Sequence, residues 1–308
     1  MTTNLYFHPV CIEHEPSPGH PESPARLRAI ADVLAKSEFD SLRRCIPSEG
    51  TRDHLMLVHH DSYVDRVFNL VPAEGYTRVD SDTIMSPKSG EAALHATGAI
   101  IEAVDAVMTG AANNAFCAMR PPGHHAEPSQ AMGFCLFNSV AIGAEYARKV
   151  HGAERVAVMD FDVHHGNGTQ AMFWNTPDLF YTSTHQWPLY PGTGDKSETG
   201  AHGNIVNAPL SVGAGSYDFR AAMREVVLPA IYDFSPDLVM VSAGFDAHQS
   251  DPLAQLALET EDFAWATDKL LRVAEKNCGG RLVSTLEGGY DLTALGESVA
   301  AHVRVLMG

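Results

Sequence analysis

The stretch Val156-Ala-Val-Met-Asp-Phe-Asp-Val-His-His-Gly-Asn-Gly168 decides the fold. Its first four residues are apolar, which is typical of a strand buried on both faces of a parallel sheet. Asp160, Asp162 and His164 follow at a spacing of two, so a backbone that stays extended would send all three side chains to the same side. Buried carboxylates and imidazoles of this kind must be paired with opposite charges or must bind a metal. The stretch therefore predicts a metal site at the carboxyl end of a strand, and the alternative is a solvated polar loop.

Apolar runs of this type alternate with helical patterns along the whole chain. Strands are predicted at 5–7, 115–118, 156–160, 180–184, 204–210, 238–242 and 282–286. Helices are predicted at 24–34, with Ser23 as the cap, at 54–64, 87–108 and 140–146, from 169, at 217–232 and 261–277, and after 290, while 76–86 is expected to be irregular. No linker or repeat interrupts the alternation. We expect a single α/β domain over residues 1–308, with a mostly parallel sheet covered by helices on both faces.

Composition narrows the class of protein. The 308 residues carry a formal net charge of −17 and no block of Lys or Arg, which argues against direct binding of nucleic acid. An acidic surface attracts cationic ligands such as lysine side chains or polyamines, or it serves solubility alone. No window is apolar enough for a membrane span, and the first residues lack the pattern of a signal peptide. Five scattered cysteines favour reduced thiols, so we expect a cytoplasmic protein.

Polar side chains follow four of the predicted strands. These are the pair His124-His125, the pair Asp162 and His164, then Asp246, then Tyr290. The carboxyl ends of parallel strands share one edge of a sheet, so these groups are expected to meet in one crevice. Asp162, His164 and Asp246 form a three-ligand set of the kind that catalytic zinc uses, although an oxygen-rich set leaves Fe²⁺ or Mn²⁺ open.

The remaining groups fit the chemistry that such a metal needs. Two carboxylate ligands nearly neutralise a divalent ion, so the ion lowers the pKa of a bound water molecule only weakly. The reaction then also needs a general base and a second electrophile. His124 or His125 can act as the base, and Tyr290 can donate a hydrogen bond to a carbonyl oxygen as charge develops on it. Each of these residues alone has an ordinary structural interpretation. Their occurrence together at four strand ends favours a catalytic site.

Seven stretches taken together resemble one enzyme family. They are His20-Pro-Glu-Ser-Pro-Ala-Arg-Leu27, Arg120-Pro-Pro-Gly-His-His125, Gly133-Phe-Cys-Leu-Phe-Asn138, Asp160-Phe-Asp-Val-His-His-Gly-Asn-Gly168, Tyr190-Pro-Gly-Thr-Gly194, Ala243-Gly-Phe-Asp246 and Glu287-Gly-Gly-Tyr290. In these motifs and their order, the chain resembles the zinc-dependent histone deacetylases, including their bacterial relatives and the acetylpolyamine amidohydrolases. The resemblance implies a three-layer α/β/α, arginase-like fold with a central eight-stranded parallel sheet. It also implies hydrolysis of an N-acetylated amine to acetate and free amine.

The resemblance assigns roles to individual residues. It puts zinc on Asp162, His164 and Asp246, and it makes His125 the general base and acid with His124 as its electrostatic partner. Asp160 matches the residue that orients His124, Asn167 the residue behind His125, and Tyr290 the tyrosine that polarises the acetyl carbonyl. Asn167, where some members carry Asp, is similar to the class II branch, and a neutral partner should make His125 less basic.

Further residues match the substrate tunnel and a second ion site. Phe134 and Tyr190 match the aromatic walls of an acyl-lysine tunnel, Gly133 and Leu253 line it, and Asp82 matches a rim aspartate. A structural monovalent-cation site, usually K⁺, is implied at Asp160, Asp162, His164, Ser183 and Thr184.

Two features bear on the substrate. Leu253 stands where the polyamine-specific relative in animals carries a gatekeeping Glu, and the loop from His14 to Pro24 is short. Together they favour acetyl-lysine, or a broad range of small substrates, over selection for an acetylated polyamine. An inactive binder of acyl ligands is the alternative from another class. Arginase shares the fold, but its two-manganese site needs a second Asp where this chain has Ala247-His248. Relatives are often dimers or tetramers, so a homo-oligomer is a family-level expectation.

Overall fold

An eight-stranded sheet forms the centre of the computed structural model, which describes residues 2–308. The strand order is β2-β1-β5-β10-β9-β6-β7-β8, and every neighbouring pair is parallel. The strands are β1 (Thr3–Tyr6), β2 (Arg43–Cys45), β5 (Asn114–Cys117), β6 (Val156–Asp160), β7 (Leu179–Gln186), β8 (Ile205–Leu210), β9 (Leu238–Ala243) and β10 (Leu282–Leu286). The predicted α/β class with a parallel sheet is confirmed.

The central strands are apolar along their length because helices cover both of their faces. Every residue of β5, β6, β9 and β10 is buried. Register then fixes which strand ends are neighbours, since Asp160 lies opposite Ser242 of β9 and opposite Ser183 of β7. The segments that leave β6, β9 and β10 therefore start side by side at one edge of the sheet.

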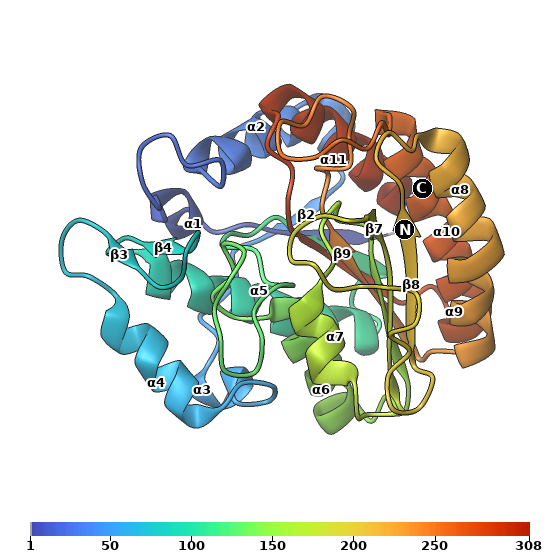
Figure 1. Cartoon of the computed structure of the whole chain (residues 1–308), viewed down its shortest axis with the longest axis horizontal. Helices are drawn as coiled ribbons and strands as arrows, with labels where there is room; N and C mark the ends of the chain where they lie inside the picture. Colours follow the sequence, from blue (N-terminus) through green and yellow to red (C-terminus); the bar gives the residue numbers. More distant parts are fainter. Residues whose placement is uncertain (1) are drawn as a thin grey trace.

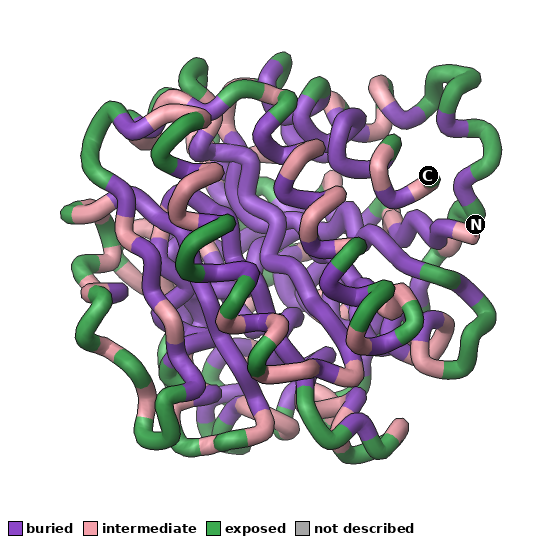
Figure 2. Tube along the Cα trace, turned by 90° about the vertical axis from the view of Figure 1, so that its right-hand side faces the viewer, coloured by how far each residue is buried: buried purple, intermediate pink, exposed green. Residues whose placement is uncertain are grey.

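Two layers of helices enclose the sheet (Figure 1). One face carries α5 (Ser89–Met108), α6 (Ser139–His151) and α7 (Asn167–Phe173). The other face carries α2 (Pro24–Leu34), α8 (Ser216–Ala222), a π-helical turn (Met223–Val227), α9 (Leu228–Phe234), α10 (Thr260–Cys278) and α11 (Leu292–Met307). Figure 2 shows the buried trace running through the strands, with the exposed segments at the periphery. Across residues 2–308, the helices are all too short or too polar to cross a membrane.

Small elements complete the chain, and they correct two predictions. The predicted helix at 54–64 is wrong, because α3 (Arg52–Leu55) and α4 (Asp61–Leu70) are separate helices with a turn between them. The segment 76–86 is not irregular throughout: β3 (Thr77–Arg78) and β4 (Ile84–Met85) pair as a short antiparallel hairpin. Two further pieces are α1 (Val10–Glu13) and a 3₁₀ turn (Ser37–Phe39).

Ser23 occupies the N-cap position of α2 with extended backbone angles, as predicted, but its side chain caps no main-chain N–H. Pro24 at the first helical position explains why the helix starts there, since its ring fixes φ at a helical value and it has no N–H to satisfy.

Candidate active site

The carboxyl edge of the sheet holds a cavity of about 180 Å³. Its lining residues come from segments that are distant in sequence: Asp82, His125, Gly133, Phe134, His164, Tyr190, Leu253 and Tyr290. All five residues that were predicted to form a substrate tunnel are among them. The structure therefore brings these side chains together around one opening, and their roles stay predictions.

Asp162, His164 and Asp246 converge at the base of this region. One potential ligand atom from each lies within 4.8 Å of the other two. The Nδ1 atom of His164 is 3.1 Å from Asp162 Oδ1 and 3.2 Å from Asp246 Oδ2, so this nitrogen faces both carboxylates. Main-chain N–H groups hold the acids in place, because Val163 donates to Asp246 and Gly288 donates to Asp162.

The protonation of these three groups indicates that a cation belongs among them. Burial by itself lowers the pKa of His164, but hydrogen bonds to Asp162 and Asp246 outweigh it and raise that pKa to about 10. Burial and the neighbouring Asp162 raise the pKa of Asp246 to about 7. Two buried carboxylates thus hold a proton on the facing imidazole at neutral pH. A divalent cation at the same point would satisfy the same oxygens and nitrogen, so the donor set fits zinc.

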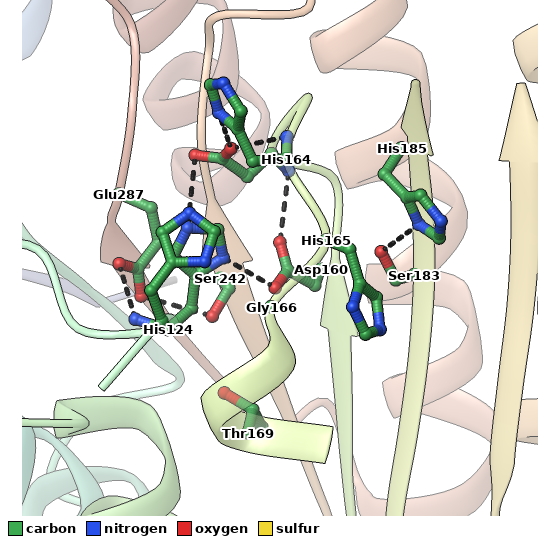
Figure 3. Close-up of polar contacts among 12 residues, drawn as sticks. His124, Asp160, His164, His165, Gly166, Thr169, Ser183, His185, Ser242 and Glu287 are labelled. Carbon is green, nitrogen blue, oxygen red and sulfur yellow. Dashed lines mark hydrogen bonds and ion pairs between the residues drawn. The ribbon is translucent and has the colours of Figure 1, made fainter. Parts of the chain in front are cut away.

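The prediction that Asp160, Asp162 and His164 point to the same side was conditional on an extended backbone, and that condition does not hold beyond Asp160, where β6 ends. The carboxylate of Asp160 instead lies behind His124, with Oδ2 at 2.9 Å from Nδ1 of that imidazole (Figure 3). The hydroxyl of Tyr181 donates to the same oxygen at 3.1 Å. Asp160 therefore orients a histidine, and Asp246, from the loop after β9, lies beside Asp162 and His164.

His124 and His125 are neighbours with opposite protonation. Burial by itself lowers the pKa of His124, but the charges of Asp160, Asp162 and Glu287 outweigh burial and raise that pKa well above its usual value. Burial lowers the pKa of His125 well below its usual value, and the cationic His124 and His164 lower it further. At neutral pH His124 is the charged imidazole and His125 the neutral one. Environments that push two pKa values apart in this way separate the roles of acid and base.

Asn167 fixes the tautomer of His125. Its Oδ1 lies 2.8 Å from Nδ1 of His125, and its own amide nitrogen donates to Glu127 Oε1 at 2.8 Å. Since the amide oxygen can only accept, Nδ1 of the neutral imidazole must carry the proton. The lone pair of His125 is then on Nε2. This residue also lines the cavity, so the base has access to a bound molecule.

Glu287 supports the histidine pair and had no predicted role. Its Oε2 accepts the main-chain N–H groups of Gly123 at 2.6 Å and His124 at 3.1 Å, and Ser242 donates to its Oε1 at 3.2 Å (Figure 3). Burial raises the pKa of this carboxyl to about 7. The signal that could have identified it is an acidic residue directly after a buried strand, the same signal that identified Asp246.

Tyr290 is a hydrogen-bond donor at neutral pH. Burial raises the pKa of its hydroxyl well above the usual value, and the charges of Asp246 and Asp162 add to that effect. The guanidinium of Arg26 lies over its ring at 4.9 Å from the centroid. Arg26 also donates to the carbonyl oxygens of Gly289 at 2.6 Å and Glu287 at 2.5 Å, so α2 holds the loop that carries the tyrosine.

One wall of the cavity requires the main chain at Gly133 to lie directly against the ring of His125. Gly133 has φ +55°, and a Cβ atom there would collide with the ring of His125. Phe134 follows with φ +68°, and its ring packs against that of Tyr290 at 5.9 Å between centroids. The Oδ1 atom of Asp82 accepts the N–H of Gly133 at 3.1 Å, which ties the β3–β4 hairpin to this wall.

Ser183 and Thr184 lie on β7 next to the end of β6. The hydroxyl of Ser183 is 2.9 Å from Nδ1 of His185, and Thr184 has a buried hydroxyl with no hydrogen-bond partner among the described residues. This orphaned polar atom is compatible with the predicted monovalent cation.

A second group of potential metal ligands consists of Glu49, Glu91 and His95. Here the carboxylate of Glu91 pairs with the ammonium of Lys88 at 2.6 Å, and the Glu49 side chain is 52% exposed. These features are typical of a solvated surface, so no metal is assigned to this group.

Comparison with known proteins gives consistent matches over nearly the whole chain. The histone deacetylase domain model matches residues 20–306. The chain is 41% identical over 300 residues to the uncharacterized protein slr0245 of Synechocystis, covering 96% of each. It is 39% identical over 312 residues to the histone deacetylase-like amidohydrolase of Pseudomonas aeruginosa, covering 94% of this chain and 81% of that protein. The crystal structure of the HDA15 HD domain superimposes with a TM-score of 0.94 at 38% identity, covering 100% of this chain and 88% of that chain.

Proposed function

Because the chain belongs to the histone deacetylase family, we propose that it is a zinc-dependent amidohydrolase that removes acetyl groups from the ε-amine of lysine in proteins or peptides. One observation carries the proposal. The neutral imidazole of His125, the protonated phenol of Tyr290 and the ring of His164 border the same 180 Å³ cavity, and the carboxylates of Asp162 and Asp246 lie beside His164. That arrangement supports hydrolysis of an amide better than any other reaction, since base, electrophile and ligand set are all in place.

Each residue has a defined task in this reaction. His125 accepts a proton on Nε2 from the water that attacks the acetyl carbonyl, because its Nδ1 is engaged by Asn167. Tyr290 donates its hydroxyl proton in a hydrogen bond to the carbonyl oxygen as negative charge develops there. When the C–N bond breaks, His125 returns the proton to the leaving amine. His124, held by Asp160, stays cationic and stabilises the negative charge of the reacting group.

Two ions complete the proposed site. Asp162, His164 and Asp246 would hold the zinc ion, with Fe²⁺ or Mn²⁺ as alternatives, and the ion would supply Lewis acidity that acidifies a water molecule and polarises the carbonyl. We assign a structural K⁺ to the neighbourhood of Asp160, Asp162, His164, Ser183 and Thr184. The buried, unpartnered hydroxyl of Thr184 supports this assignment.

The cavity supports a lysine-like substrate. Phe134 and Tyr190 border it, and aromatic side chains can enclose a four-carbon stem while the acetyl group reaches His125. Leu253 adds an apolar wall in place of a carboxylate that would select a second ammonium. An acetylated polyamine or another small N-acyl amine is the alternative substrate. The five free cysteines support a reducing, cytoplasmic location.

The test is kcat/KM on zinc-loaded protein for an acetyl-lysine peptide against N-acetylputrescine, with acetate release as the readout. We expect a preference for the peptide of at least about tenfold, because Leu253 offers no partner for a second ammonium. A preference for N-acetylputrescine would establish the alternative substrate class. Tight binding of either compound without release of acetate would contradict an enzymatic function and favour a binder of acyl ligands.

A further inference from the structure

One buried carboxylate links the two loops that follow β9 and β10. Asp251 is 8% exposed and lies five residues after the proposed ligand Asp246. Its Oδ2 accepts the main-chain N–H of Tyr290 at 2.7 Å and that of Asp291 at 3.4 Å. Its Oδ1 accepts the main-chain N–H of Leu253 at 3.0 Å. Three backbone donors from two segments therefore end on one side chain.

The linked segments both contribute residues to the lining of the cavity. Leu253 and Tyr290 both line it, and they belong to loops that are separated by α10 and β10 in sequence. The loops are already paired closer to the sheet, where the N–H of Phe245 donates to Gly288 at 3.0 Å. Asp251 extends that pairing outward to the residue that bears the phenol. The main-chain position of Tyr290 is thus fixed relative to the segment that begins with Asp246.

The charge of Asp251 is satisfied by these N–H groups. Within residues 2–308 no ion pair to Asp251 is present, and burial raises the pKa of its carboxyl while its three N–H donors and the charge of Arg26 lower it. A buried carboxylate without a salt bridge costs free energy unless its hydrogen bonds are complete.

We propose that Asp251 is a positioning residue that sets the placement of the Tyr290 hydroxyl and of the Leu253 wall relative to the proposed metal ligand Asp246. The proposal rests on the proposed function, in which Tyr290 polarises the acetyl carbonyl. Asp251 touches neither substrate nor metal in this scheme. It acts only through the two loops that it joins, so its effect should be on the reaction step and not on the capacity to hold a metal.

Substitution by Asn is the sharpest change, because it keeps the size of the side chain. An amide offers one acceptor oxygen, and its NH₂ group would face an N–H donor at the other position. Asp251→Asn therefore releases either Leu253 or the Tyr290 loop. A displacement of about 1 Å at a reacting group can cost roughly 10²-fold in rate. We expect kcat on the acetyl-lysine peptide to fall about 10²-fold, with KM changed less than about threefold.

A matched control is Asp237→Asn. Asp237 also accepts two main-chain N–H groups from another segment, those of Glu154 and Arg155, both at 2.9 Å. It lies at the amino ends of β6 and β9, on the opposite edge of the sheet. This control should retain kcat within about twofold, and both variants should retain one zinc per chain. Loss of zinc from Asp251→Asn would overturn the proposal, because the residue would then support the metal site.

A double-mutant cycle with Tyr290→Phe separates positioning from general stability. If Asp251 acts through the phenol, Asp251→Asn should lower kcat about 10²-fold in the wild-type background but only a few-fold in the Tyr290→Phe background. Equal losses in both backgrounds would overturn the proposal and leave the proposed function intact. A Tyr290→Phe variant with near-normal kcat would instead overturn the mechanism itself, and the positioning role with it.

Hydrogen exchange provides a readout that does not depend on activity. In the zinc-loaded protein, the amide proton of either Leu253 or Tyr290 should exchange at least about tenfold faster in Asp251→Asn than in wild type, because that N–H loses its acceptor. Amides of β9 and β10 should be unchanged. Unchanged exchange at both loop positions would overturn the proposal even if kcat fell.

Discussion

Asn167 leaves the imidazole of His125 without a negative charge behind it, and this has a measurable consequence for pH dependence. Burial, His124 and His164 lower the pKa of His125, so its neutral, basic form is present from well below neutral pH upward. Asn167→Asp would place a carboxylate 2.8 Å from Nδ1 and stabilise the imidazolium. The pKa of His125 should then rise by about one unit or more, and the acidic limb of the kcat/KM profile should move to higher pH by the same amount.

The control for this shift is Asn277→Asp, which adds the same charge on α10, where the amide donates to Val273 within its own helix. Its profile should overlay that of the wild type. An acidic limb that stays in place in Asn167→Asp would show that His125 is not the group whose protonation limits the rate.

A substitution at Gly288 tests whether Asp162 and Asp246 bind the zinc ion. Its φ is not in the left-handed region, so an added Cβ would not strain the backbone. The Cβ would instead collide with the carboxylates of Asp246 and Asp162. Gly288→Ala should therefore weaken zinc binding by about 10–100-fold, the size of effect seen when groups that orient metal ligands are changed. The measurement is competition with a chelator.

Gly296→Ala on α11 is the comparison for Gly288→Ala, because the nearest atom to its Cβ would be a methyl group of Val33, at 3.2 Å, and no carboxylate lies close to it. Its zinc affinity should equal that of the wild type. Equal affinities for all three proteins would remove Asp162 and Asp246 from the ligand set.

At the scale of elements, a buried ionic network joins α2 to the loops around the site. Glu22, Arg26 and Arg120 are completely buried, with Arg120 Nη2 at 2.5 Å from Glu22 Oε2 and Arg26 Nη1 at 3.1 Å from Oε1. Arg120 precedes the segment of the histidine pair, and Arg26 holds the loop after β10. One carboxylate therefore pairs with two guanidinium groups that position both halves of the site.

Glu22→Gln should lower the free energy of unfolding by about 3–5 kcal/mol, because it leaves buried guanidinium groups without a counter-charge. Burial by itself raises the pKa of Glu22, but Arg120 and His14 hold it well below its usual value. The stabilisation is thus present above pH 4.5 and is lost as the pH falls below it. Urea unfolding at pH 7 and pH 4 measures both effects. Equal stability of wild type and variant at pH 7 would contradict them.

The same elements explain what the sequence could and could not predict. Strands β6, β9 and β10 are continuous apolar runs, and their parallel order brings Asp162, Asp246 and Tyr290 to one edge, so the α/β class and this convergence were predictable from local pattern. The other cavity-lining residues were expected only from the family resemblance. The buried acidic residues that hold these loops in place were not predictable from the sequence. Glu22 and Asp251 sit in polar segments that look like solvated loops, and their partners are 98 and 39 residues away. Such pairs become visible only when tertiary packing brings the segments together.

For the molecule as a whole, the net charge of −17 should affect how substrates arrive. A negative field attracts cationic peptides, and salt screens it with a Debye length of about 10 Å at 0.1 M. We expect kcat/KM for a lysine-rich acetylated peptide to fall several-fold between low and moderate ionic strength. A peptide with neutral flanks should be nearly insensitive to salt. Parallel salt dependence for both peptides would contradict steering by charge.

The position of β10 has a consequence for the order in which the protein can be made. This strand is the last of the sheet in sequence, yet it lies between β5 and β9. Before residues 282–286 leave the ribosome, β2-β1-β5 and β9-β6-β7-β8 have no strand to join them, and their inner edges stay open. Tyr290 is delivered by the same segment that closes this gap. A nascent chain therefore gains the Tyr290 phenol and its continuous sheet in one late step, and a partly synthesised protein has neither.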